Sequence, residues 1–149
     1  MKDCFYQYRK GLYQKLQGIT YKGVTVPVFE FAKADQKTPF IQILGMNSTY
    51  ERDDDKFLQS VTTDIMVVTS QPGDPGDFGS MQSDEIMNEV MERLITKGVT
   101  KSDRAAHIKM DDFIDNGCFF VNLSYDNEFD GANTYIRKIL TINTLIEEV

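Results

Sequence analysis

The sequence predicts an α+β fold: a mostly antiparallel β-sheet with two packed helices, in the element order α-β-β-β-α-(β)-β-β. Two segments with helical apolar periodicity are separated by segments rich in β-branched residues, and charged or Gly-rich turns connect the latter. Strands joined by hairpins favour an antiparallel sheet, whereas a βαβ array needs a helix after each strand. We expect one domain over residues 1–149, which is long enough to build a core without disulfide or metal staples.

The first helix is predicted over residues 4–17. Asp3 is placed to cap its N-terminus and Gly18 to end it, and one face carries an apolar stripe of Phe5, Tyr8, Leu12 and Leu16. Gly11, in the middle, costs about 1 kcal/mol relative to alanine in a helix interior. The helix is therefore expected to depend on docking rather than on its own propensity.

Three strands are predicted next. Valines alternate with other residues over 24–31, and Pro27 places this strand at a sheet edge because proline cannot donate a hydrogen bond to a ladder. Residues 39–50 and 57–70 are predicted to be two longer strands. The segment between them is too polar to be buried and is expected to project as a hairpin tip, Glu51-Arg52-Asp53-Asp54-Asp55-Lys56.

The Pro- and Gly-rich segment 71–79 is predicted to be a loop, followed by a second helix over 81–97. Ser80 or Ser83 can cap this helix, and Gly98 follows its end. It has the strongest amphipathic pattern in the chain, with a stripe of Ile86, Met87, Val90, Met91, Leu94 and Ile95 that is expected to face the core.

Two further strands are predicted over 118–125 and 134–146, with a turn at 126–131 between them and a short strand near 108–110 before them. Alternation places Phe119, Val121, Leu123 and Tyr125 on one face of the first. It places Ile136, Leu140, Ile142 and Ile146 on one face of the second.

Charge is distributed unevenly along the chain. The net charge is −7, yet residues 1–23 carry +4 and the remaining residues −11. This acidic balance argues against the phosphate attraction that dominates binding to duplex DNA. Arg9, Lys10 and Lys15 could form a basic contact face for head-to-tail self-association or simply a solvated helix face, and the sequence leaves both interpretations open.

No secretory leader and no membrane span is expected. Residues 1–18 mix charged and amide side chains with aromatic ones, and no apolar run approaches the roughly 20 residues that cross a bilayer. The two cysteines, Cys4 and Cys118, have no metal-ligand spacing, which is typical of a reducing compartment. We expect a soluble protein that is not exported by a cleaved leader.

Catalytic patterns are weak. His107 is the only histidine, so a nucleophile–base pair would have to join it to Cys4 or Cys118. No nucleophile-elbow signature accompanies either cysteine, and Cys118 is expected to be an inert thiol in an apolar strand. The sequence therefore predicts that the protein is not an enzyme.

Phosphate and metal sites are not predicted either. Gly73, Gly76 and Gly79 follow neither phosphate-loop spacing, and Asp74 and Asp77 would repel a phosphate. Three acidic clusters are interpreted as solvated loops, turns or subunit contacts rather than metal sites: Asp53-Asp54-Asp55, Asp111-Asp112 and Asp126-x-Glu128-x-Asp130. We expect no cofactor.

A pattern over roughly 130 residues resembles the tail-terminator, or tail-completion, proteins of tailed bacteriophages. It is carried by Leu16-Gln17-Gly18, Tyr21-x-Gly23-Val24-x-Val26-Pro27-Val28-Phe29 and Thr38-Pro39-Phe40-Ile41-Gln42-Ile43-Leu44-Gly45. The charged hairpin tip, the long strand 61–70, the amphipathic helix and the final strand pair complete the pattern. Phe40 stands where the family usually has tyrosine.

The resemblance implies a non-enzymatic virion protein that forms a homo-oligomeric ring at the head–tail junction, a hexamer with a dodecamer as the alternative. Such a ring ends tail growth, contacts neck, portal-adaptor or tail-tube proteins, and lets genomic DNA pass without sequence-specific binding. It would be assembled in the host cytoplasm and reside in the virion neck. Under this interpretation Glu51 to Lys56 and the loop with Asp74 and Asp77 are inter-subunit or lumen positions, although ordinary solvated loops explain them almost as well.

Two alternatives stay open from the sequence. The same fold could be one of several stacked collar rings in a short-tailed phage. A small hydrolase that uses Cys118 and His107 is the alternative from a different functional class.

Overall fold

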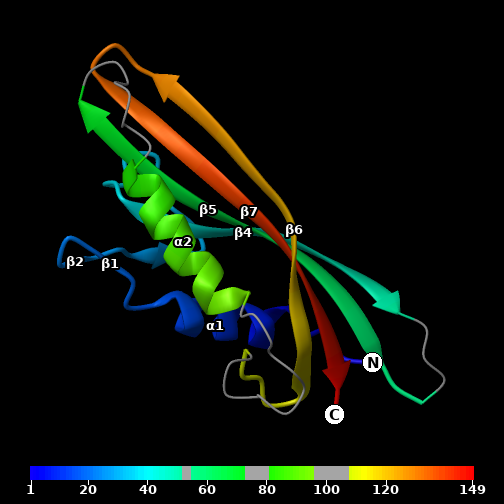
Figure 1. Ribbon diagram of the computed structural model, residues 1–149. Coiled ribbons are helices and arrows are strands. Elements are labelled where there is room, and N and C mark those ends of the chain that lie inside the picture. Colours follow the sequence, from blue (N-terminus) through cyan, green and yellow to red (C-terminus); the bar gives the residue numbers. More distant parts are fainter. Residues whose placement is uncertain (52–54, 73–80, 96–107) are drawn as a thin grey trace.

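The computed structural model describes residues 1–51, 55–72, 81–95 and 108–149. A five-stranded mixed sheet, ordered β3-β4-β5-β7-β6, has both helices on one side, and β1 and β2 form a separate two-stranded sheet (Figure 1). The helices are α1 (Phe5–Leu16) and α2 (Met81–Leu94). The strands are β1 (Thr20–Tyr21), β2 (Val24–Thr25), β3 (Val28–Phe29), β4 (Phe40–Glu51), β5 (Leu58–Pro72), β6 (Phe113–Phe129) and β7 (Asn133–Glu148). The predicted α+β class is confirmed.

The pairing of the strands follows the hairpin prediction. β4–β5, β5–β7 and β7–β6 are antiparallel, and β3–β4 is the parallel pair. The edge position predicted from Pro27 is confirmed, because β3 is the outermost strand and the Pro27 carbonyl accepts a hydrogen bond from the Ile41 N–H.

The single strand predicted over 24–31 is wrong, since the chain splits there into β2 and β3. Lys22 and Gly23 have φ of 49° and 79° and join β1 to β2 in a two-residue turn. Consecutive positive φ angles match the right-handed twist of a tight hairpin, which binds β2 to β1 instead of to the main sheet. The short strand predicted near 108–110 is reduced to an isolated bridge between Lys109 and Ile114.

The core lies between the sheet and the two helices. The predicted face of β7 is confirmed, because Ile136, Leu140, Ile142 and Ile146 are all buried. Four stripe residues of α2 are buried, namely Ile86, Met87, Val90 and Leu94, while Met91 and Ile95 are partly exposed. Arg93 of α2 donates hydrogen bonds to the Lys15 and Gln17 carbonyls at the end of α1, so it ties the two helices together.

The start of α1 differs from the prediction by one residue. Cys4 occupies the N-cap position and the helix begins at Phe5, whose N–H donates to the Asp3 carboxylate at 2.8 Å. Asp3 therefore supplies the acceptor for the first turn from one position further upstream than predicted. Gly18 ends the helix as predicted, with φ 82°.

The alternation predicted for β6 is wrong. β6 has register shifts between Asp115 and Cys118 and between Phe120 and Asn122. A bulge adds one residue to one strand and reverses the alternation beyond it. Phe119 consequently pairs with Asn143 on the side away from the helices, and Leu123 pairs with Leu140 on the helix side.

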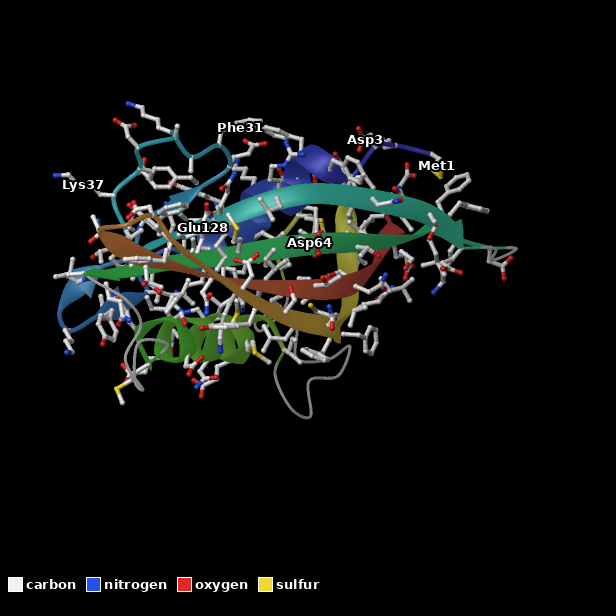
Figure 2. All side chains as sticks on the ribbon, turned by 90° about the horizontal axis from the view of Figure 1, so that it is seen from above. Met1, Asp3, Phe31, Lys37, Asp64 and Glu128 are labelled. Atoms are coloured by element: carbon white, nitrogen blue, oxygen red, sulfur yellow. The ribbon has the colours of Figure 1, made fainter. Side chains whose placement is uncertain are left out.

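The second face of the sheet is open, because no helix among the described residues covers it (Figure 2). Its centre is polar: Asn143 donates hydrogen bonds to the Ser60 and Thr62 hydroxyls, and the Thr141 hydroxyl donates to Asp64 at 2.6 Å. Antiparallel sheets commonly have one buried and one solvated face, and these paired side chains suit a face exposed to water.

Candidate assembly surface

The predicted hairpin tip joins β4 to β5, where Glu51 pairs with Leu58. Lys56 Nζ lies 3.4 Å from Glu147 Oε1, so the tip is tied to the end of β7. Arg52, Asp53 and Asp54 lie outside the described residues, and Asp55 and Lys56 are exposed. The exposed connection between two antiparallel strands is confirmed, and its role in assembly stays a prediction.

The second predicted loop begins at the opposite end of β5. Pro72 pairs with Asn133, and Asp74 and Asp77 lie outside the described residues. Since β5 has 15 residues and a strand rises about 3.3 Å per residue, its two ends are roughly 45–50 Å apart. The described residues that flank the two predicted loops therefore lie at opposite ends of β5.

The predicted basic face is partly used within the protein. Arg9 Nη1 pairs with the Glu30 carboxylate, and Lys15 is half-buried with its carbonyl bound to Arg93. Lys10 is exposed and lines an open groove of about 770 Å³ beside α1. A contact role for this face stays a prediction, and Lys10 is its most accessible cation.

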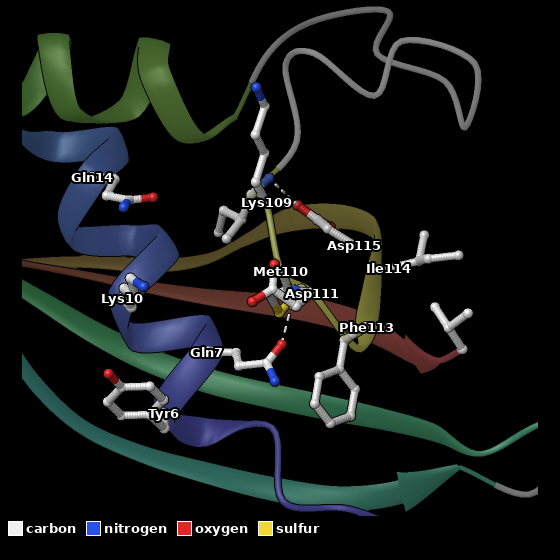
Figure 3. A pocket seen from close by; sticks show the side chains of 12 residues that line it. Tyr6, Gln7, Lys10, Gln14, Lys109, Met110, Asp111, Phe113, Ile114 and Asp115 are labelled. Carbon is white, nitrogen blue, oxygen red and sulfur yellow. Dashed lines mark hydrogen bonds between the residues drawn. The ribbon is translucent and has the colours of Figure 1, made fainter.

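The groove beside α1 is built by side chains that hold the segment before β6 against the helix (Figure 3). Gln7 accepts hydrogen bonds from the Asp111 and Asp112 N–H groups and donates one to the Asp112 carboxylate. The buried Asp115 carboxylate accepts from the Ile108 and Gly117 N–H groups at 3.0 and 2.8 Å. These hydrogen bonds give the Asp112 and Asp115 carboxylates structural roles.

Close packing explains the glycine in α1. A Cβ on Gly11 would lie 2.3 Å from Ile108 Cγ2 and 3.0 Å from the Lys109 carbonyl oxygen. The segment thus crosses the helix at a distance that only glycine permits.

The acidic turn after β6 is also structural, as the sequence predicts. The Ala132 and Asn133 N–H groups donate to Asp130 and hold the pKa of that carboxyl below its usual value. Asp126 and Glu128 both pair with Arg137 on β7. Among the described residues, no three His, Cys, Asp or Glu side chains are grouped closely enough to hold a metal ion.

The surface that sequence reasoning missed is an apolar strip on β6. We call it the β6 strip and define it as Phe119, Phe120, Val121, Leu123, Tyr125 and Phe129, which are 38–59% exposed. In the described part of the chain no strand pairs with the outer edge of β6, and only Ile114 forms a bridge there, so the backbone groups of the strip are also open. A long apolar edge strand invites pairing with another chain, and soluble monomers normally avoid one.

Part of the β6 strip borders a hollow of about 310 Å³. Phe120 lines it together with Asn88, Met91, Glu92 and Ile95 of α2. The two stripe residues that α2 leaves partly exposed, Met91 and Ile95, therefore extend the apolar surface from β6 toward the helix. The signal in the sequence was the density of aromatic residues at 119–129, and alternation alone could not show that they lie at an exposed edge.

The thiols are poor nucleophiles. Burial raises the pKa of Cys4 and of Cys118 to about 11, and the Cys4 Sγ–H group donates to Gln59 Oε1 at 3.4 Å. At neutral pH only about one molecule in 10⁴ would carry the thiolate at either position. His107, the predicted partner of Cys118, lies outside the described residues.

The raised thiol pKa values predict that stability falls at high pH. Between pH 9 and 11 an unfolded chain loses protons that the native chain keeps, so the free energy of unfolding decreases as the pH rises. Chemical denaturation at pH 8, 9, 10 and 11 measures this decrease. The double variant Cys4→Ala, Cys118→Ala should show a shallower decrease, and an equally steep one would contradict the assignment. The double variant should keep part of the decrease, because burial also raises the pKa of Tyr8.

Comparisons with known proteins identify a similar fold. No protein-family model matches the chain, and no curated protein matches its sequence. A chain from a solved structure described as the virion of a native gene transfer agent particle superposes with a TM-score of 0.71. The superposition covers 99% of this chain and 99% of that chain at 11% identity. The likeness therefore extends over the whole α+β fold. Neither described helix is long and apolar enough to span a membrane.

Proposed function

We propose that the protein is a non-enzymatic structural virion protein of a tailed bacteriophage or a related particle. It forms a homo-oligomeric ring, a hexamer, at the head–tail junction, where it completes the tail. The observation that carries this proposal is the superposition, over 99% of both chains, on a chain of a structure described as the virion of a gene transfer agent particle. The exposed β6 strip adds support, because such an edge is explained by assembly.

Passage of DNA through the ring is part of the proposal. The wall of a lumen should not bind the phosphates of passing DNA tightly, and a chain with a net charge of −7 meets that condition. The described centre of the open face has hydroxyl and amide groups and the Asp64 carboxylate, and the Arg137 of this face pairs with Asp126 and Glu128. We assign this face to the lumen, with the hairpin tip and the 71–79 loop at the two rims.

The test is the assembly state of the purified protein. Native mass spectrometry and negative-stain images are expected to give a ring of one mass with a central hole. A concentration of about 100 μM is well above the dissociation constants of typical specific complexes. A protein that stays monomeric at that concentration would overturn the proposal.

Assembly is expected to depend on salt. The cations of residues 1–23 and the acids of the rest of the chain attract each other across subunits, and salt screens such surface pairs. The mean oligomer mass should decrease between about 0.05 and 1 M NaCl, a range over which the screening length falls severalfold. An unchanged mass would show that charge does not contribute to the subunit contact.

A further inference from the structure

We propose that the β6 strip is a docking surface for a second copy of this chain, which presents to it the opposite edge of its own sheet. That edge consists of the β4 segment Met46–Glu51 together with the exposed side of α1. The inference rests on the proposed ring and names the seam that joins its subunits.

Open backbone groups are available on both sides of this seam. β3 covers β4 only at Ile41 and Gln42, so among the described residues no strand pairs with the outer side of Met46–Glu51. Beyond the bridge between Lys109 and Ile114, the outer side of β6 likewise has no paired strand among the residues that the structure describes. Joining the two edges satisfies N–H and C=O groups that are otherwise left to water, which is the way in which one chain extends the sheet of another.

Strand direction favours this pairing. Along the order β4-β5-β7-β6 each neighbour is antiparallel, so β4 and β6 run in opposite directions. A head-to-tail neighbour that is rotated about an axis close to the strands keeps its orientation, and its β4 then meets β6 antiparallel. Antiparallel ladders have the stronger hydrogen-bond geometry, and a head-to-tail contact can close into a ring.

Charge distinguishes the two edges. Residues 116–130, which include the β6 strip, hold Asp126, Glu128 and Asp130 and no lysine or arginine, and α2 beside them has four acids, Asp84, Glu85, Glu89 and Glu92, against one arginine, Arg93. The edge on the other side carries α1, with Lys10 and Lys15. Figure 2 shows α1 on the β4 side of the sheet and α2 on the β6 side. A β6–β6 contact would bring two acidic segments together, whereas β6 against the α1 edge joins opposite charges.

The α1 edge also supplies apolar surface to match the β6 strip. Tyr6 and Tyr13 of α1 are 75% and 41% exposed and lie with Lys10 at spacings of three and four residues, on one side of the helix. Tyr50 at the end of β4 is 51% exposed. Aromatic rings with a nearby cation on one edge thus face aromatic rings with nearby carboxylates on the other.

Two variants test the seam by complementation. The strip variant, Phe119→Lys with Phe120→Lys, places cations opposite the basic edge, because the strand register puts these two residues level with Asn47 and Met46 of β4. The edge variant, Tyr6→Glu with Lys10→Glu, places acids opposite the β6 strip. All four side chains are exposed or partly exposed, and circular dichroism checks that both variants fold. The matched control is Met66→Lys, which adds a cation to the open face of the central strand β5.

Each variant alone is expected to sediment as a monomer, and Met66→Lys as the wild-type ring. Mixing the two variants restores a seam between the unmodified strip of one and the unmodified edge of the other, so complexes containing both are expected. A strip variant that still forms rings would overturn the seam while leaving the proposed ring intact. Variants that are monomeric alone and do not combine when mixed would also overturn it. An edge variant that still assembles while the strip variant is monomeric would overturn it too, because that result indicates a β6–β6 contact. A monomeric wild type would instead overturn the proposed function.

Discussion

Gly11→Ala is expected to destabilise the protein by about 2 kcal/mol, although alanine is the better helix former. The new Cβ would overlap Ile108 Cγ2 at 2.3 Å and press on the Lys109 backbone oxygen at 3.0 Å. Overpacking of this kind costs up to about 3 kcal/mol, and the gain in helix propensity returns only about 1 kcal/mol. Ile108 is itself buried, and its N–H is held by Asp115, so the segment cannot easily withdraw.

Thermal unfolding measures this effect, with an expected decrease of roughly 4–8 °C in Tm for a chain of this size. Gly45→Ala is the control, because nothing lies within 4 Å of a Cβ at that position in β4. Its Tm should change by less than about 2 °C, as at other uncrowded surface sites. Equal changes in the two variants would show that the crossing of α1 by residues 108–110 is looser than described.

Leu140→Ala is expected to have the larger effect, a loss of about 2–5 kcal/mol in the free energy of unfolding. Leu140 is fully buried on the helix side of β7, where it pairs with Ile65 on one neighbour and with Leu123 on the other. Removing its side chain leaves a cavity between the sheet and the helices. Because β7 is paired with a strand on each side, the surrounding structure cannot easily relax to fill that cavity.

The adjacent residue provides the control for this substitution. Ile139 lies next to Leu140 on the same strand but on the open face, where it pairs with Met66 and Ser124. Ile139→Ala should cost about 1 kcal/mol, since its side chain is only partly removed from water. Urea unfolding measures both values. A loss at Ile139 equal to that at Leu140 would mean that the open face is covered in solution.

Both helices, the β4–β5 and β6–β7 hairpins and the buried face of β7 were predictable from the sequence. Each depends on a local rule: apolar residues at helical spacing, strict alternation in β7, and charged or Gly-containing turns between strands. The positions of the hairpin tip and of Pro27 at a sheet edge followed from the same rules. These features are local because each is set by residues within one or two turns or one strand pair.

The candidate site was less predictable. Phe119 and Leu123 were predicted to share a face because alternation cannot detect the bulge at Val121, which places them on opposite faces of the sheet. Nor can it show that α2 lies over β5 and β7 and leaves β6 at the edge, half exposed. Arg9 and Glu30 are 21 residues apart, so their pairing, which removes one cation from the predicted basic face, is equally invisible locally.

The sequence by itself determined the α+β class, the acidic balance and the order of the elements, because composition and short-range periodicity carry that information. Only the tertiary structure decided which strand lies at the edge, which residues of β6 are exposed and why α1 needs a glycine. Those properties depend on contacts between residues distant in sequence, as between Gly11 and Ile108 or Phe120 and Met91. An edge exists only once the neighbouring strands are in place.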